Sequence, residues 1–313
     1  MKYLKSNLFA VILLISAMIF AGCESSTDPV KPNVKDVNAP TNLMANAKDD
    51  STIVIKFTSS TSKDSSFFKD YVLYINPGMS EKKVIDKSSN MITITGLQSG
   101  TLYTFELAAR NTEEKESAKI SVSWATATRF TGIKLYETNS SFASGLELFN
   151  TESQRPETYK IANSDKWDIA LDTKGESFDI GSPTLTSYNI TTPRTTFVKM
   201  RDSWIGVNSL DDIFDTEMLD PNQANLINFN SVTKGFAFAV KTQDGHFAKV
   251  FVKAVDGKIL QGTADNRYIE VDISYQKTAN LPYAKIRPVE NDNNSNGVNS
   301  SIKVTNIKKN VIE

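Results

Sequence analysis

Apolar side chains recur at every second position through much of this chain, and this alternation constrains its fold more than any other feature. Ile53, Ile55 and Phe57 occupy alternate positions, and the same spacing returns across residues 103–109 and 236–240. Successive side chains of a strand point to opposite faces of a sheet, so the pattern is typical of strands with one buried face. Asn-Pro-Gly and Asp-Gly turn signals separate the runs, and helix signals are few. We therefore expect a mainly β protein.

The length of the chain suggests its number of domains, and its net charge limits the partners it can bind. The chain has 313 residues, which suggests about two domains of ~150 residues each. Hydrophobic residues make up 40% and charged residues 23%, enough apolar material for buried cores. The net charge of −1 gives no strong positive field, so nucleic acid is not an expected partner.

The first residues predict export. Two lysines, Lys2 and Lys5, precede an apolar run over 8–21, which ends in Phe-Ala-Gly and then Cys23. The run of ~14 residues is shorter than the ~20 that a membrane-spanning helix needs. A positive start, a short apolar run and small residues before a cleavage point indicate a signal peptide over 1–22.

Cys23 is the single cysteine, so no intrachain disulfide is possible. The segment that ends at Cys23 resembles a lipobox, in which the cysteine thiol is acylated, for example with palmitate, and becomes the new N-terminus. The resemblance implies a lipid anchor in the cell envelope, at the outer membrane or cell surface. The alternative is a plain secretory signal with an incidental cysteine. Residues 23–38 are polar and contain proline, which predicts a flexible tether.

Residues 39–128 contain a series of short strand patterns and a motif, Leu97-x-x-Gly100-Thr101-x-Tyr103. This span resembles a fibronectin type III domain. The resemblance implies a β-sandwich in which the Tyr103 ring packs inside and its hydroxyl bonds nearby backbone, an arrangement called a tyrosine corner. Such a domain is expected to be a spacer that holds the next domain away from the membrane, or else a surface that binds a partner directly.

In the later half of the chain, three fragments are informative about the fold: 166–171, 240–250 and 268–276. Their order and spacing resemble the HmuY-type haem-binding lipoproteins, which implies a second, mostly β domain over 130–313. A polar Asn- and Ser-rich stretch at 291–301 predicts a loop or linker inside it, followed by a short closing segment.

The HmuY-type resemblance implies capture of haem or a related tetrapyrrole for uptake, with an outer-membrane haem transporter or host haemoproteins as partners. That family holds the iron with two axial side chains, usually histidines and in some relatives methionines. Met200 and Met218 are the candidate axial ligands, because both fall between the Trp-Asp fragment and the later hairpin. His246, the only histidine, is the less favoured candidate beside a hairpin turn. Core packing is the competing explanation for each methionine.

Catalytic patterns are missing from the sequence. No histidine accompanies a nucleophile, no His/Cys cluster predicts zinc and no Gly-rich loop predicts phosphate binding. An acidic patch formed by Asp211, Asp212, Asp215 and Glu217 is expected to be a solvated face. We therefore expect no enzyme and no further metal. The alternatives to haem capture are a surface adhesion module that binds glycan or protein, and a structural component of the envelope.

Overall fold

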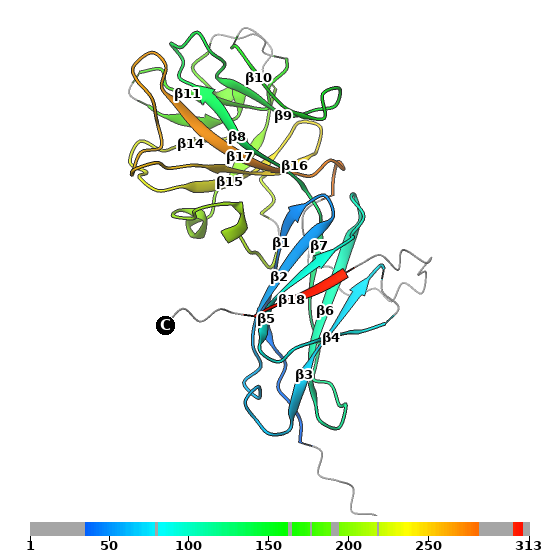
Figure 1. The fold of residues 1–313 in the computed structure, drawn as a ribbon. Coiled ribbons are helices and arrows are strands. Elements are labelled where there is room, and N and C mark those ends of the chain that lie inside the picture. The colour runs from blue at the N-terminus through cyan, green and yellow to red at the C-terminus, as the bar shows by residue number, and fades with distance from the viewer. Residues whose placement is uncertain are drawn as a thin grey trace, which may run out of the picture. The chain divides into compact units, whose positions relative to one another are not determined.

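A computed structural model describes residues 35–78, 81–161, 165–175, 177–188, 194–217, 219–281 and 303–308. Residues Asp36–Glu313 form one compact unit, and the elements described in it are nearly all strands, as the alternation predicts (Figure 1). The earlier strands are β1 (Thr41–Asp49), β2 (Thr52–Thr58), β3 (Phe68–Asn76), β4 (Lys83–Ile85), β5 (Ser89–Thr95), β6 (Leu102–Asn111) and β7 (Ile120–Ala125). The later strands are β8 (Thr128–Tyr136), β9 (Gly145–Asn150), β10 (Arg155–Tyr159), β11 (Ile169–Asp172), β12 (Asp179–Gly181), β13 (Phe197–Lys199), β14 (Leu226–Asn228), β15 (Phe236–Lys241), β16 (Phe247–Val252), β17 (Tyr268–Tyr275) and β18 (Lys303–Lys308).

The earlier strands form a sandwich of two antiparallel sheets, with strand orders β1-β2-β5-β18 and β4-β3-β6-β7. Ile53, Ile55 and Phe57 are all buried in the core between these sheets, which confirms the expected inward face of β2. Tyr71 and Trp124 are fully buried in the same core. We call this part the first sandwich.

Tyr103 makes the predicted tyrosine corner. Its ring is fully buried, and its hydroxyl oxygen accepts a hydrogen bond of 2.8 Å from the backbone N–H of Gln98. Gly100 between them has φ +78°, a left-handed backbone conformation that favours glycine. The motif therefore fixes both the side chain and the loop that precedes β6.

The last described strand differs from the expected organisation. The sequence assigns residues after 301 to the later domain, whereas β18 pairs antiparallel with β5 of the first sandwich, from Lys303 opposite Thr95 to Lys308 opposite Ser89. Figure 1 shows β18 in red beside the blue and cyan strands of that sheet. Without β18, strand β5 would present a row of open backbone groups, which sheets tend to cover.

The later strands β8 to β17 form the second sandwich, with strand orders β10-β9-β11-β12-β14 and β13-β15-β16-β17-β8. One hydrophobic cluster joins residues of both sheets, among them Leu146 and Ile169 from one sheet and Phe238 and Ile273 from the other. Trp167 is fully buried just before β11. A side chain at Gly145 would come within 2.7 Å of the Trp167 ring, so glycine there lets the indole pack on the backbone.

Helical structure in the described residues is confined to three short 3-10 turns: η1 (Pro183–Leu185), η2 (Asp202–Trp204) and η3 (Leu210–Asp212). Ser209 caps η3 through a capping box with Asp212, and the turn ends at Asp212. No helix in the described part of the chain is long and apolar enough to cross a membrane.

Candidate binding site

Of the residues predicted to ligate haem iron, Met200 and His246 lie within the described part of the chain. Met200 follows β13 and is partly buried against the core of the second sandwich, which matches ordinary packing. Met218 and the lipidation candidate Cys23 lie outside the described residues. Met200 therefore cannot be paired with Met218 on structural grounds, and both remain predictions.

His246 lies in the hairpin between β15 and β16, as its position beside Asp244-Gly245 predicts. Its Nδ1 atom is 3.1 Å from the carbonyl oxygen of Gln276, and its ring stacks on Tyr275 with centroids 5.4 Å apart. One ring nitrogen thus contacts the protein backbone. Neither of the two surface hollows described below includes Met200 or His246 in its walls. Haem ligation by Met200, Met218 or His246 therefore stays a prediction.

A hollow of about 580 Å³ opens at one side of the second sandwich. It lies between β8 and β10, each of which is the edge strand of its own sheet. Lys134 and Tyr136 line it from β8, and Arg155 and Glu157 line it from β10. A cavity of ~300–1,000 Å³ is the usual size for a small-molecule site. The opening between the edge strands β8 and β10 is thus lined by charged and aromatic side chains.

The carboxylate of Glu157 is held in place at this hollow. The Tyr159 hydroxyl donates to Glu157 Oε2 at 2.7 Å and to Glu147 Oε2 at 2.9 Å. Hydrogen bonds from Ser153 and Tyr159 lower the pKa of Glu157. Burial, together with the two carboxylates that accept its proton, raises the pKa of Tyr159. Glu157 is therefore an ionised acceptor with a fixed orientation.

Tyr136, which lines the hollow, packs against two further aromatic rings, and we call Tyr136, Phe142 and Tyr268 the aromatic platform. The centroid of Tyr136 lies 4.7 Å from that of Phe142 and 5.5 Å from that of Tyr268. Phe142 is 54% exposed, unusually high for a large hydrophobic side chain. The Lys134 Nζ atom lies 4.2 Å from the Tyr268 centroid, so a cation and two tyrosines share the surface. Aromatic rings held open to solvent beside charged groups are typical of ligand-binding surfaces.

An ion pair between the buried Glu137 carboxylate and the partly exposed Arg267 guanidinium lies next to the platform in the chain. Glu137 follows Tyr136 and is buried, and its Oε2 atom accepts hydrogen bonds of 2.9 and 2.7 Å from the Arg267 guanidinium. Its Oε1 atom accepts the backbone N–H of Arg267 at 2.7 Å. Burial raises the pKa of Glu137, but the Arg267 hydrogen bonds outweigh it, so the pKa lies below its ordinary value. Since Arg267 precedes Tyr268, this pair fixes the spacing of the two tyrosines.

A second hollow, of about 440 Å³, lies elsewhere on the second sandwich. Val207, Lys234, Phe251, Lys253 and Val255 contribute to its walls. Phe251 is buried and belongs to a hydrophobic cluster. Lys253 pairs with Glu270 at 2.7 Å and with Asp272 at 3.0 Å. Phe251 is thus engaged in core packing, and Lys253 is engaged in ion pairs.

The acidic patch is exposed at Asp211, Asp212 and Glu217, as expected, and differs from that expectation at Asp215. Asp215 has a side chain only 5% exposed, and its carboxylate lies 3.3 Å from Lys249 Nζ and 3.4 Å from an Arg201 nitrogen. The Lys249 ammonium also lies 5.0 Å from the Trp124 ring centroid and 5.5 Å from that of Trp204. Burial lowers the pKa of Lys249, although Asp215 opposes it. Asp215 differs because it pairs with the buried ammonium of Lys249. Lys249 is distant in sequence, so the residues around Asp215 do not predict this pair.

In the described residues, no group of three or more His, Cys, Asp or Glu side chains could hold a metal ion. Asp215 instead joins the two sandwiches, because its backbone carbonyl accepts the N–H of Ala45 at 2.9 Å. Asp215 therefore has a structural role.

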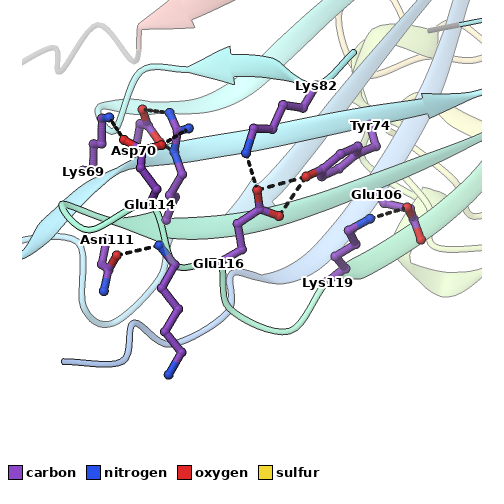
Figure 2. Close-up of polar contacts among 11 residues, drawn as sticks. Lys69, Asp70, Tyr74, Lys82, Glu106, Asn111, Glu114, Glu116 and Lys119 are labelled. Atoms are coloured by element: carbon purple, nitrogen blue, oxygen red, sulfur yellow. Dashed lines mark hydrogen bonds and ion pairs between the residues drawn. The ribbon is translucent and has the colours of Figure 1, made fainter. Parts of the chain in front are cut away.

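Charged side chains also lie on and beside the outer face of β3 and β6, as Figure 2 shows. The Arg110 guanidinium donates to both Asp70 oxygens, at 2.8 and 2.7 Å, and this pair is buried. The Tyr74 hydroxyl contacts Glu116, which also pairs with Lys82 at 2.7 Å. These charged groups therefore pair with one another, and their ion pairs contribute to the surface of the fold and do not form a ligand site.

Comparison with known proteins identifies the first sandwich. Residues 38–131 match the family profile of the fibronectin type III domain. The arrangement of β1 to β7 and the tyrosine corner agree with it, so this part of the chain is a fibronectin type III domain. The HmuY-type resemblance of the later half remains a prediction.

Solved structures of low identity align with the chain. A fibronectin type III domain of human collagen α-1(XX) is 20% identical over 29% of this chain and 86% of its own length, with a TM-score of 0.24. A two-domain fibronectin type III segment of chicken tenascin is 12% identical over 75% and 98%, with a TM-score of 0.26. A DUF4466 family protein from Parabacteroides merdae is 11% identical over 78% and 100%, with a TM-score of 0.36. No curated protein matches the chain.

Sequence reasoning did not single out the aromatic platform. Tyr136 and Tyr268 come from strands far apart in the chain, and their contact depends on the pairing of β8 with β17. Phe142 carried the one local signal, since it follows Asn139-Ser140-Ser141 in a polar turn, where an aromatic residue has no strand to bury it.

Proposed function

We propose that this chain is a non-catalytic binding protein of the cell envelope, anchored by lipid on Cys23, that engages its ligand at the aromatic platform. The observation that carries the proposal is Phe142, an exposed ring that packs against Tyr136, which lines an open hollow. A contiguous group of aromatic rings beside a hollow is the kind of surface that marks an interaction site, whereas a single exposed apolar side chain is not. The fibronectin type III domain acts as the spacer between membrane and ligand.

The class of the first sandwich supports this proposal. Fibronectin type III domains are commonly found in adhesion or binding proteins and are typically non-catalytic. The buried charges of the chain also favour it. Arg110 with Asp70, and Lys249 with Asp215, are ion pairs within the fold, so each of these buried charges is engaged by its partner.

Adhesion is tested on whole cells that display the full chain. Cells with the unaltered chain are expected to bind components of parallel glycan and protein arrays, and cells with Phe142→Ser are expected to lose that binding. Val84→Ser is the matched control, because Val84 is a similarly exposed apolar residue, at 56%, on the first sandwich. Equal binding by both variants would contradict a role for the platform.

The anchor is tested separately. Labelling with a palmitate analogue is expected to mark the full chain, and Cys23→Ser is expected to abolish the label and release the protein from the membrane fraction. A label that persists in Cys23→Ser contradicts lipidation at this residue.

Haem or tetrapyrrole uptake is the competing prediction, drawn from the HmuY-type resemblance. Titration of the full chain with haemin, followed by visible absorption, tests it. A Soret shift that disappears in Met200→Ala or Met218→Ala would restore the predicted ligand pair. No shift would leave adhesion as the function.

A further inference from the structure

We infer that the ligand of the aromatic platform is a carbohydrate chain, bound across the hollow between β8 and β10. This inference rests on the proposed function and specifies the ligand class of the same site. It follows from three properties of the surface: the rings, the polar groups beside them and the shape of the strand edge.

The rings suit one face of a sugar. A pyranose presents several C–H groups on one face, and these groups pack against the electron-rich face of an aromatic ring. Phe142 is exposed enough to offer such a face, and Tyr136 continues the platform into the hollow. Tyr268 also packs against Tyr136. A ligand longer than one sugar ring can therefore contact more than one aromatic residue.

The polar groups suit the hydroxyls of a sugar, which both donate and accept. Glu157 is an ionised acceptor held by Tyr159, so it pays little ordering entropy when a hydroxyl donates to it. Arg155 and Lys134 line the same hollow as donors. A haem pocket would instead be enclosed and mostly apolar, and this hollow is neither.

The edge strand does not suit a peptide that binds by strand addition. Such a peptide needs a regular row of open backbone groups on the edge strand. The pairing of β8 with β17 shifts register between Val271 and Ile273, next to Gly132, which has φ +74°. The Gly132 N–H is already taken by Asp272 Oδ1 at 2.9 Å. This bulge bends the edge that lines the hollow, so side-chain recognition of a sugar fits better than backbone pairing.

The test uses the purified full chain in detergent on two arrays. One carries neutral oligosaccharides of glucose, galactose and mannose together with sialylated ones, and the other carries peptides and matrix proteins. Phe142→Ala and Glu157→Gln are expected to weaken oligosaccharide binding about tenfold or more, because each removes one of the two kinds of contact. Val84→Ala on the first sandwich is expected to leave the affinity unchanged. Circular dichroism checks that each variant is folded.

The outcomes separate the two claims. Oligosaccharide binding that falls in Phe142→Ala and Glu157→Gln, and not in Val84→Ala, supports the inference. Oligosaccharide binding that neither platform variant changes overturns the assignment to this hollow. Protein or peptide binding that depends on Phe142, with no oligosaccharide binding, overturns the ligand class while the proposed function stands. No binding on either array overturns both.

Discussion

The two sandwiches use their polar side chains differently. In the first sandwich the charged groups on and beside the outer face of β3 and β6 pair with one another. The loop before β6 is fixed by a hydrogen bond between Gln98 and Tyr103, which are close in sequence. In the second sandwich the stabilising pairs, such as Glu137 with Arg267, join distant segments and lie next to an exposed aromatic surface. The comparison shows paired charges on the first sandwich and, on the second, an exposed aromatic ring next to a charged hollow, which is the surface that we propose binds a ligand.

The largest effect is expected from Trp167, the anchor of the second sandwich. Trp167→Ala is expected to lower the free energy of unfolding by about 3–5 kcal/mol, because it removes a fully buried indole and leaves a cavity. Urea unfolding followed by circular dichroism measures it. Trp167→Phe is the graded control. The indole N–H has no hydrogen-bond partner among the described residues, so its loss costs nothing and the penalty is smaller. Equal losses in both variants would contradict a packing role.

The next effect compares a buried ion pair from each sandwich. Lys249→Met is expected to cost about 3 kcal/mol, because the Asp215 carboxylate stays buried after losing this cation. Arg110→Met is expected to cost a similar amount through Asp70. The double variant Lys249→Met with Asp215→Asn is expected to recover most of the loss. If it is no more stable than Lys249→Met, the penalty does not come from an uncompensated carboxylate. Urea midpoints of the four proteins provide the measurement.

How far the sequence predicts this structure depends on the distance between the residues that define each feature. The tyrosine corner is local, and the motif from Leu97 to Tyr103 was sufficient to predict it. The strands were predictable because alternation is also local. The Asp215–Lys249 pair and the aromatic platform were not, since each needs the pairing of distant strands, and a charged or aromatic residue by itself has the same sequence signature whether it is buried or exposed.

A smaller effect is expected at the tyrosine corner of the first sandwich. Tyr103→Phe keeps the buried ring and removes only the hydroxyl that accepts from the Gln98 N–H, so it is expected to cost about 1 kcal/mol. Amide hydrogen exchange is expected to show faster exchange at the Gln98 N–H. The exchange rate at the Ser60 N–H, which donates to the Tyr71 hydroxyl in the same sandwich, is the internal control. Unchanged exchange at Gln98 would mean that the loop is held by other contacts.

The smallest effect is a pH dependence that belongs to the second sandwich. Because the pKa of Glu137 is lower in the folded chain than its ordinary value of 4.5, this group stabilises the fold above that value. The contribution is lost as the pH falls through the lowered, folded-state pKa, where the carboxylate takes up a proton and its hydrogen bonds with Arg267 weaken. Glu137→Gln removes this titration, so its urea midpoint is expected to fall less than that of the unaltered chain between pH ~7 and pH ~3. Glu152, exposed on the same sandwich and bonded only through its backbone, supplies the control Glu152→Gln, which is expected to retain the full pH dependence. Parallel curves for the unaltered chain and Glu137→Gln would show that Arg267 positions the two tyrosines by packing and not by its charge.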